Sequence, residues 1–361
     1  MRRREFNRSL LGLPLAAAMP AMAFTHSEND LLAMPPGGSI TDVPGLKVGH
    51  CTLTERPTGC TVLLCEAGAT AGVDVRGAAP GTRETDLLSP VNAVQQVNAI
   101  LLSGGSAYGL DAATGVMRWL EENHSGYKIG KLGVVPIVPA AILMDLGVGD
   151  FKIRPNAESG YKACIAASSG PVAEGNVGAG AGATVGKMFG RRFAMKAGIG
   201  TASVRIGGIV VGALVAVNAV GDVVNPQTGK VLAGARTEDG TGFRDSMASM
   251  LRGDLIDLEA LANSTLGVVA TNAVFTKTQM TKIAQMAHDG YARAINPVHT
   301  MADGDTIFAM STGTSTEKAD ESVIGAIAAT VMARAIVRAA MQATSLPALN
   351  LPAWRDYAGR G

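Results

Sequence analysis

Apolar and polar positions alternate along the chain in two patterns, which together predict a mixture of strands and helices. Short apolar runs that end at glycine, proline or polar residues predict strands, and apolar residues three to four positions apart predict helices. One such helix covers residues 106–123, and another follows the Thr-Lys-Thr-Gln capping box at 276–279. The predicted strands cover residues 61–66, 71–76, 99–103, 133–138, 203–223 with a break at Gly207-Gly208, 266–271 and 307–310.

A third long helix is predicted over residues 321–343, where apolar residues occupy most of the circumference, so we expect it to be buried. A shorter helix is predicted over residues 243–251. Strands that alternate with buried helices, without an internal repeat, predict an α/β fold arranged as a layered sandwich. The 361 residues would fill about two domains or one large α/β domain.

The first 23 residues have the features of a targeting segment, so we exclude them from the fold. Arg3-Arg4-Glu5-Phe6 matches the twin-arginine pattern, and an apolar stretch follows from Leu10 to Met22. This stretch is short for a membrane-spanning helix and is rich in alanine and proline. Ala21-Met22-Ala23 is an A-x-A processing site. We therefore expect an exported, periplasmic protein whose mature chain begins at Phe24.

Composition and charge narrow the classes of function. A hydrophobic content of 47% with 17% charged residues excludes disorder over most of the length. With 31 Lys and Arg against 30 Asp and Glu, the chain lacks the basic excess of a nucleic-acid-binding protein. The four cysteines form no C-x-x-C motif and the five histidines have no ligand spacing, so we expect neither a metal nor a cofactor.

The cysteines leave one question open. An oxidising compartment would permit a disulfide among Cys51, Cys60 and Cys65, and the sequence does not decide which pair would form it. We expect most of the cysteines to be small buried hydrophobic residues.

A glycine-dense loop at residues 175–186 invites two nucleotide-binding interpretations, and both fail. A phosphate-binding loop ending at Gly186-Lys187 would need glycine and a hydroxyl residue where Ala181 and Met188 stand. Residues 178–183 give half of a dinucleotide-binding fingerprint, but no acidic residue follows at the required spacing.

Serine–histidine catalysis has no clear sequence support either. Ser106 lacks the second glycine of a nucleophile elbow, because Tyr108 occupies that position, so we expect Ser106 to cap a helix. His124 and His288 lie on predicted helices and are expected to face solvent.

Small polar residues stand directly before the strand at 266–271, and this run belongs to a set of motifs in order along the chain. The set comprises residues 41–50, 74–77, 81–87, 102–113, 147–150 and the run around Asn263-Ser264. In these motifs the chain resembles the L-aminopeptidase/D-esterase/amidase family over most of residues 39–315. That family consists of self-processing hydrolases with an amino-terminal nucleophile, and it includes β-aminopeptidases and the endo-type hydrolase of nylon oligomers.

The resemblance implies an αββα sandwich like that of other amino-terminal-nucleophile hydrolases, with different strand connectivity, assembled as a homotetramer. It also implies a precursor that cuts itself between Asn263 and Ser264. The cut would leave an α chain of residues 24–263 and a β chain of residues 264–361.

The resemblance gives roles to several residues. A serine hydroxyl needs a base, and the α-amine of Ser264, with an ordinary pKa of about 7.7–8.0, can serve once the chain is cut. Asn218 matches the family's oxyanion donor. Lys187 matches a lysine near the nucleophile that stabilises negative charge or keeps the amine neutral.

Two positions depart from the aminopeptidase branch. Asp303 and Asp305 match two aspartates of the nylon-oligomer branch that orient the nucleophile, where the aminopeptidase branch is more like Ser and Glu. We expect one of these carboxylates to hold the amine of the nucleophile, which leaves the other to receive the ammonium group of a substrate or to shape a longer groove. Met144 stands where several relatives carry an aromatic residue, and it cannot donate a hydrogen bond.

The leading hypothesis is an exported amidase that releases amino-terminal residues from short peptides, amides or esters. Hydrolysis of short ω-amino-acid oligomers is an alternative. Acyl transfer, as in ornithine acetyltransferase, and an inactive periplasmic binding protein are two further alternatives. The export signal argues against acyl transfer, and the intact Ser264 and Asn218 argue against an inactive binding protein.

Overall fold

The computed structural model describes residues 38–254 and 263–358, so the predicted targeting segment lies outside the described residues. The largest sheet has nine strands, in the order β10-β11-β14-β16-β2-β4-β7-β3, with β1 also paired to β2. These strands are β1 (Lys47–Thr52), β2 (Gly59–Val75), β3 (Thr82–Arg83), β4 (Gln96–Ser103), β7 (Ala140–Ile142), β10 (Ile199–Ile206), β11 (Ile209–Ala216), β14 (Leu266–Thr271) and β16 (Thr306–Ser311).

Helices and small sheets surround this large sheet. The α-helices are α1 (Ala112–Glu122), α2 (Ala157–Ile165), α3 (Ser246–Arg252), α4 (Lys277–Ala294) and α5 (Glu321–Met341). The small sheets are β12 (Asp222–Val224) with β13 (Val231–Ala233) and β15 (Ile295–Asn296), β5 (Tyr127–Ile129) with β6 (Gly133–Val135), and β8 (Thr184–Val185) with β9 (Met195–Lys196).

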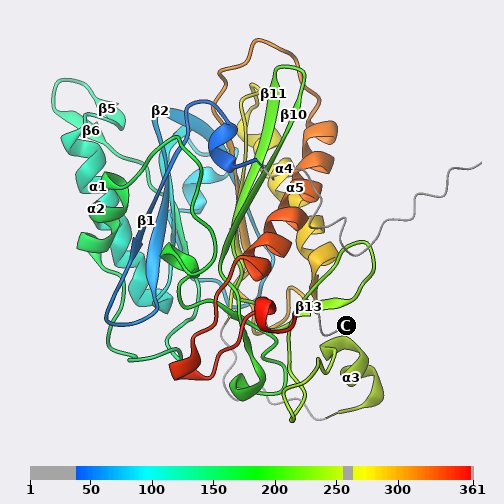
Figure 1. The fold of residues 1–361 in the computed structure, drawn as a ribbon. Helices are drawn as coiled ribbons and strands as arrows, with labels where there is room; N and C mark the ends of the chain where they lie inside the picture. Colours follow the sequence, from blue (N-terminus) through cyan, green and yellow to red (C-terminus); the bar gives the residue numbers. More distant parts are fainter. Residues whose placement is uncertain (1–37, 255–262, 359–361) are drawn as a thin grey trace, which may run out of the picture. The chain divides into compact units, whose positions relative to one another are not determined.

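The long strand β2 joins two layers of strands. Its first half pairs with β1 and β4, its second half pairs with β16, and its register shifts between Leu64 and Ala69. Figure 1 shows the order of the layers from side to side: α1 and α2, then β1 and β2, then β10 and β11, then α4 and α5. The expected αββα sandwich is therefore confirmed, with its two strand layers continuous through β2.

Three apolar cores separate the four layers, because side chains of one strand alternate between its two faces. In β11, Ala213 packs toward α4 and α5, whereas Leu214 packs between the strand layers. In β2, Val62 packs with the residues of α1 and α2, whereas Leu63 packs between the strand layers. Strands that are apolar on both faces are what this architecture requires.

The helix pair α4 and α5 covers the outer face of β10, β11 and β16. The predicted capping box is present: Thr276 accepts from the amide of Gln279, and the Gln279 side chain accepts from the Thr276 amide. Within the described residues, α5 alone is long and apolar enough to cross a membrane, but 67% of its most apolar window is buried. Its contacts with α4, β10 and β11 make it a core helix, as predicted.

Several other predicted elements are confirmed. The break at Gly207-Gly208 separates β10 from β11, and the predicted strands near residues 266 and 307 correspond to β14 and β16. The predicted strands at 61–66 and 71–76 are parts of the single bulged strand β2. All four cysteines are free thiols, three of them buried.

Three expectations are wrong. In the segment predicted as a buried strand at 133–138, only residues 133–135 form a strand, the exposed hairpin strand β6, whereas Ile137 and Val138 are buried but belong to no strand. Ser106 begins a 3-10 turn after Gly105, and its side chain makes no capping hydrogen bond. His288 is completely buried, because its face of α4 packs onto β2, where Nε2 lies 3.1 Å from the carbonyl oxygen of Asp74.

The contact between α4 and α5 generates a prediction about stability. A Cβ atom at Gly290 would lie 2.4 Å from the carbonyl oxygen of Ala329, whereas one at Gly325 would meet the flexible end of Met286. We expect Gly290→Ala to lower the free energy of unfolding by about 1–3 kcal/mol, because backbone must move. Gly325→Ala is the matched control and should cost less in the same denaturant titration. Equal effects of the two substitutions would contradict this packing.

Candidate active site

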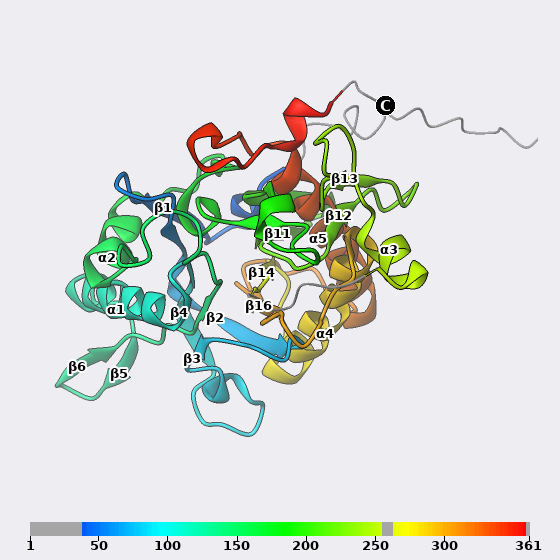
Figure 2. The same cartoon turned by 90° about the horizontal axis from the view of Figure 1, so that it is seen from below.

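The bond between Asn263 and Ser264 lies at the entrance to β14, between the ends of β11 and β16. The amide of Asn263 donates to the carbonyl oxygen of Ala302 (2.9 Å), and the amide of Ser264 donates to that of Asn218 (3.1 Å). Both residues are buried. Figure 2 shows β14 and β16 side by side between α4 and β2. Two neighbouring strand ends therefore hold this peptide bond in a fixed position.

The carbonyl oxygen of Asn263 accepts two hydrogen bonds. The Ser264 hydroxyl donates one, and the amide of Gly304 donates the other at 2.9 Å. A Cβ atom at Gly304 would lie 2.5 Å from Ser264 Oγ and 2.4 Å from the carbonyl oxygen of Ala79. The Asp-Gly-Asp motif thus brings a backbone donor to the carbonyl oxygen that the Ser264 hydroxyl also contacts. Sequence reasoning missed this donor, because it named only the flanking aspartates.

Asp303 fixes the turn that carries Gly304. Its Oδ1 accepts from the amide of Val220 (3.2 Å), and its Oδ2 accepts from the hydroxyl (2.6 Å) and amide (3.2 Å) of Thr300. Burial, aided by the charge of Asp305, raises the pKa of Asp303 to about 6.

Asp305 holds the other side of the same turn. Its Oδ1 accepts from the amide of Thr265 (2.8 Å), and its Oδ2 lies 2.8 Å from His299 Nδ1. The oxygens of Asp303 and Asp305 thus accept hydrogen bonds from the protein itself, and both residues are 1% exposed. This geometry favours a role in holding the surroundings of Ser264 over binding the ammonium of a substrate.

Residues 74–77, one of the sequence motifs, clamp the turn from the neighbouring strand β2. The amides of Arg76 (3.0 Å) and Gly77 (3.2 Å) donate to the carbonyl oxygen of Asp305, and the amide of Ala79 donates to that of Asp303 (2.9 Å). The motif therefore supports the site through backbone contacts.

Asn218 and Lys187 meet directly beside the Asn263–Ser264 bond. Lys187 Nζ (2.8 Å) and the amide of Thr184 (3.1 Å) donate to Asn218 Oδ1, while Asn218 Nδ2 donates to the carbonyl oxygen of Met144 (3.2 Å). Burial lowers the pKa of Lys187 well below its ordinary value, and the nearby Asp303 charge opposes this shift. Met144 thus contributes its backbone to the site, although its side chain cannot donate.

Aromatic and imidazole rings pack beneath the turn. The ring centres of His288 and His299 lie 4.8 Å apart, and Tyr291 donates to the carbonyl oxygen of Thr265 (3.2 Å). Burial lowers the pKa of His288 to about 3, so this ring is neutral at ordinary pH. The contact between His299 and Asp305 was not predicted, because the two residues belong to a loop without a recognised histidine motif.

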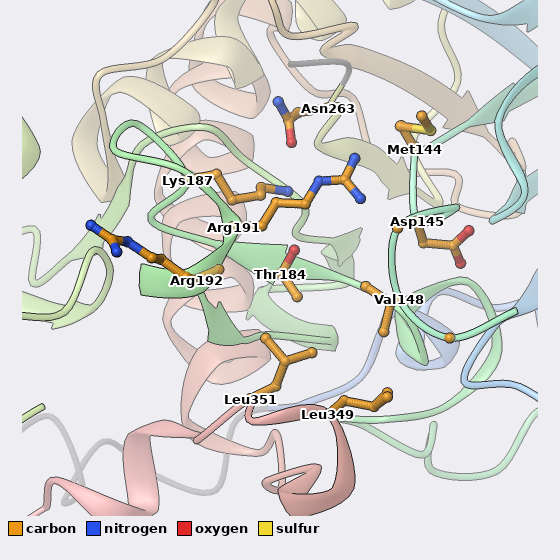
Figure 3. Close-up of a pocket in the computed structure, with 13 residues that line it drawn as sticks. Met144, Asp145, Val148, Thr184, Lys187, Arg191, Arg192, Asn263, Leu349 and Leu351 are labelled. Carbon is orange, nitrogen blue, oxygen red and sulfur yellow. The ribbon is translucent and has the colours of Figure 1, made fainter. Parts of the chain in front are cut away.

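A pocket of about 250 Å³ opens beside Asn263 (Figure 3). Asp145 lies in its wall in a fully buried ion pair with Arg56 (2.7 Å). Among the described residues, no group of three or more His, Cys, Asp and Glu side chains could hold a metal ion. The pocket is lined by Met144, Asp145, Gly147, Val148, Gly149, Thr184, Lys187, Arg191, Arg192, Ala194, Asn263, Leu349 and Leu351.

Known proteins are similar to this chain in sequence and in fold. The family model described as Peptidase family S58 matches residues 38–351. An uncharacterized aminopeptidase of Mycobacterium leprae is 43% identical over 356 residues, covering 88% of this chain and 93% of that relative. A 6-aminohexanoate-oligomer endohydrolase of a Kocuria species is 30% identical, covering 83% of this chain and 85% of the relative.

Solved structures agree with the sequence relatives. A Burkholderia β-aminopeptidase superposes with a TM-score of 0.64 at 25% identity, covering 88% of this chain and 92% of that structure. The L-aminopeptidase D-Ala-esterase/amidase of Ochrobactrum anthropi gives a TM-score of 0.65 at 21% identity, covering 87% of this chain and 90% of that structure, which is described as a new variant among the Ntn hydrolase fold.

The layered fold and these relatives define a hydrolase that acts on peptide or amide bonds. The chain belongs to Peptidase family S58. The resemblance found in the sequence is therefore confirmed, and the five predicted site residues Ser264, Asn218, Lys187, Asp303 and Asp305 come together around one peptide bond.

The close approach at Gly304 generates a prediction. The family resemblance predicts a cut between Asn263 and Ser264, and we expect Gly304→Ala to prevent this cut, because the added methyl group would displace Ser264 Oγ from the Asn263 carbonyl. Gly242→Ala is the control, since a Cβ atom there would have its nearest neighbour at 4.0 Å. A denaturing gel of both purified proteins makes the comparison. If Gly304→Ala is cut as fully as the control, the close approach of residue 304 to Ser264 Oγ does not control cleavage of the Asn263–Ser264 bond.

Proposed function

We propose that the protein is a self-processing serine amidase that uses Ser264 first on its own chain and then on substrates. The observation that carries the proposal is the arrangement at one bond: the Ser264 hydroxyl contacts the Asn263 carbonyl, and the Gly304 amide donates to the same oxygen. A nucleophile with a donor placed on the oxygen that gains charge is the basic requirement of acyl transfer.

In the first reaction, Ser264 Oγ attacks the carbonyl carbon of Asn263 and loses its proton. The carbonyl oxygen becomes an oxyanion, which the Gly304 amide stabilises. The bond to the Ser264 nitrogen then breaks, the nitrogen takes up a proton, and an ester joins Asn263 to the serine oxygen. Water hydrolyses this ester and leaves a carboxylate at Asn263 and a free amine at Ser264.

In the second reaction, the released α-amine takes the hydroxyl proton of Ser264 as the hydroxyl attacks the carbonyl carbon of a substrate amide. The substrate C–N bond then breaks, the leaving nitrogen takes the proton from the α-ammonium, and the acyl group stays on Ser264 as an ester. The resulting ester is hydrolysed by water in the same way. The Ser264 nitrogen donates to the carbonyl oxygen of Asn218, and Lys187 donates to the side chain of the same asparagine. Asn218 and Lys187 therefore lie next to the Ser264 nitrogen. We assign Asn218 to the substrate oxyanion; its Nδ2 now donates to Met144, so this contact must be shared or exchanged.

We propose short peptides and amides as the substrates, in line with the aminopeptidase relatives. Hydrolysis of ω-amino-acid oligomers is the second candidate, supported by the similarity to a 6-aminohexanoate-oligomer endohydrolase. The paired aspartates favour it as well, because they match that branch of the family. Acyl transfer and a non-catalytic binding role remain weaker alternatives without such an observation.

We also propose that the chain is exported to the periplasm and assembles as a homotetramer of cut chains, 24–263 and 264–361. The twin-arginine pattern at Arg3-Arg4 and the processing site at Ala21-Met22-Ala23 support the export. The family resemblance supports the assembly and the chain boundaries.

Removal of the nucleophile tests self-processing. We expect wild-type protein to appear on a denaturing gel as two chains that part before Ser264, and Ser264→Ala to appear as one chain without amidase activity. The reason is that, among the residues that the structure describes, the hydroxyl in contact with the Asn263 carbonyl oxygen is that of Ser264. The neighbouring Thr265→Val is the control and should still be cut. A single wild-type chain with full activity would refute the mechanism.

The charge of Asp303 generates a prediction about pH. If the Ser264 amine is the base, kcat/KM rises with pH as the ammonium loses its proton. Above about pH 6 Asp303 is ionised, and its negative charge stabilises the ammonium and raises the pKa of the amine. We therefore expect Asp303→Asn to move the rise in kcat/KM to lower pH. A shift to higher pH, or a flat wild-type profile with chemistry rate-limiting, would contradict this assignment.

A further inference from the structure

We propose that the pocket beside Asn263 binds the acyl part of the substrate and that Arg191 receives a carboxylate carried by it. This inference rests on the proposed function and specifies its substrate class. The preferred substrates would be amides and short peptides whose acyl group is acidic, such as a glutamyl group.

The position of Asn263 identifies the acyl side of the site. In self-cleavage Asn263 is itself the acyl group, because Ser264 attacks its carbonyl carbon. The nucleophile stays at the end of β14 for the second reaction, so the substrate's acyl carbonyl must take the place of the Asn263 carbonyl. The pocket whose wall includes Asn263 therefore lies beside the substrate's acyl group.

The charged side chains around this pocket differ in what they contact. Its described lining includes three basic side chains, Lys187, Arg191 and Arg192, against the single acidic side chain of Asp145. Both carboxylate oxygens of Asp145 already accept hydrogen bonds from the protein. Its Oδ1 accepts from Arg56 (2.7 Å) and from the amide of Gly105 (2.8 Å), and its Oδ2 accepts from the hydroxyl of Thr58 (2.6 Å). Lys187 donates to Asn218, and Arg192 pairs with Glu238. Arg191 is the basic side chain of the described lining whose guanidinium is directed into the pocket.

Arg191 and Arg192 differ in direction. Figure 3 shows the guanidinium of Arg191 pointing toward Met144 and Asp145, whereas that of Arg192 points to the opposite side. Arg192 lies 2.9 Å from Glu238, and both of these side chains are more than 70% exposed. Arg191 is half-buried and belongs to the pocket interior.

Gly147 supports the position of Arg191. A Cβ atom at residue 147 would lie 0.9 Å from Arg191 Nη1, so the guanidinium rests where any other residue would place its side chain. A guanidinium has five N–H donors, and it can receive a carboxylate while it keeps another partner.

The rest of the lining suits the stem of an acidic acyl group. Val148, Ala194 and Leu351 are buried apolar residues of the pocket wall. They would contact methylene groups and exclude water from the charge pair, and a less hydrated pair interacts more strongly. A carboxylate at the end of a short aliphatic chain matches both features.

The test compares the p-nitroanilides of glutamate and glutamine, which have nearly the same shape and differ in charge. We expect wild-type kcat/KM to favour the glutamyl substrate by about tenfold or more, as a charged hydrogen-bonded pair should. Arg191→Gln should lower this glutamyl-to-glutaminyl ratio by about tenfold. Gly147→Ala should also lower it, because the added methyl group displaces the guanidinium without removing its charge.

Two control variants test whether the change in the glutamyl-to-glutaminyl ratio is specific to Arg191. Arg192→Gln removes the neighbouring guanidinium and should retain most of the wild-type ratio. Arg205→Gln lies on the exposed end of β10 and should leave both activities unchanged. A wild-type ratio near one, or the same ratio in Arg191→Gln as in wild type, would overturn the inference. The proposed function would still stand if the glutaminyl substrate is hydrolysed.

A binding measurement distinguishes failure of the proposed function from failure of the pocket assignment. If the cut protein hydrolyses neither substrate, the proposed function fails, and calorimetric titration with free glutamate and glutamine then tests the pocket alone. Tighter binding of glutamate that disappears in Arg191→Gln supports the assignment of the pocket. Equal binding of the two amino acids, or glutamate binding unchanged by Arg191→Gln, contradicts it.

Discussion

The contact between the Gly304 amide and the Asn263 carbonyl oxygen is the constraint on which the rest of the site depends. It requires a residue without a Cβ atom, because Ser264 Oγ and the backbone of Ala79 occupy the adjoining space. It also requires a rigid turn, which Asp303 and Asp305 provide through hydrogen bonds to backbone amides on both sides. The layered fold supplies the frame, since β11 ends and β14 and β16 begin at this point.

Buried charge is concentrated around this constraint. Lys187, Asp303 and the Arg56–Asp145 pair are all almost completely buried near the site. Burial of an ionic group is costly unless partners compensate for the lost water, so these groups must be held in place by the surrounding backbone. The cost favours a functional explanation, because a site that handles protons and developing charge needs ionisable groups away from solvent.

Much of the fold could be predicted from local pattern. The capping box of α4 and the apolar strands β11, β14 and β16 carry strong local signals. The strand predicted at 133–138 failed because residues 133–135 belong to a small exposed hairpin, while Ile137 and Val138 are buried in a segment without regular structure. His288 failed because the polarity of one side chain does not reveal which face of a helix another element covers.

The candidate site also has features that the sequence predicts and features that it does not. Ser264, Asn218, Lys187 and the two aspartates could be named, because a family resemblance links side chains that are far apart in sequence. The Gly304 amide, the His299 contact and the position of Arg191 could not. A backbone donor has no residue-type signal, and the other two depend on how separate loops pack together.

The central claim is that the fold itself brings Ser264 to cut the preceding bond. The most direct measurement follows the splitting of freshly folded precursor by intact-mass spectrometry over a wide range of protein concentrations. The account predicts a first-order rate independent of concentration, with one chain ending at Asn263 and the other beginning at Ser264. A rate that rises with concentration, or a new terminus at another residue, would contradict it.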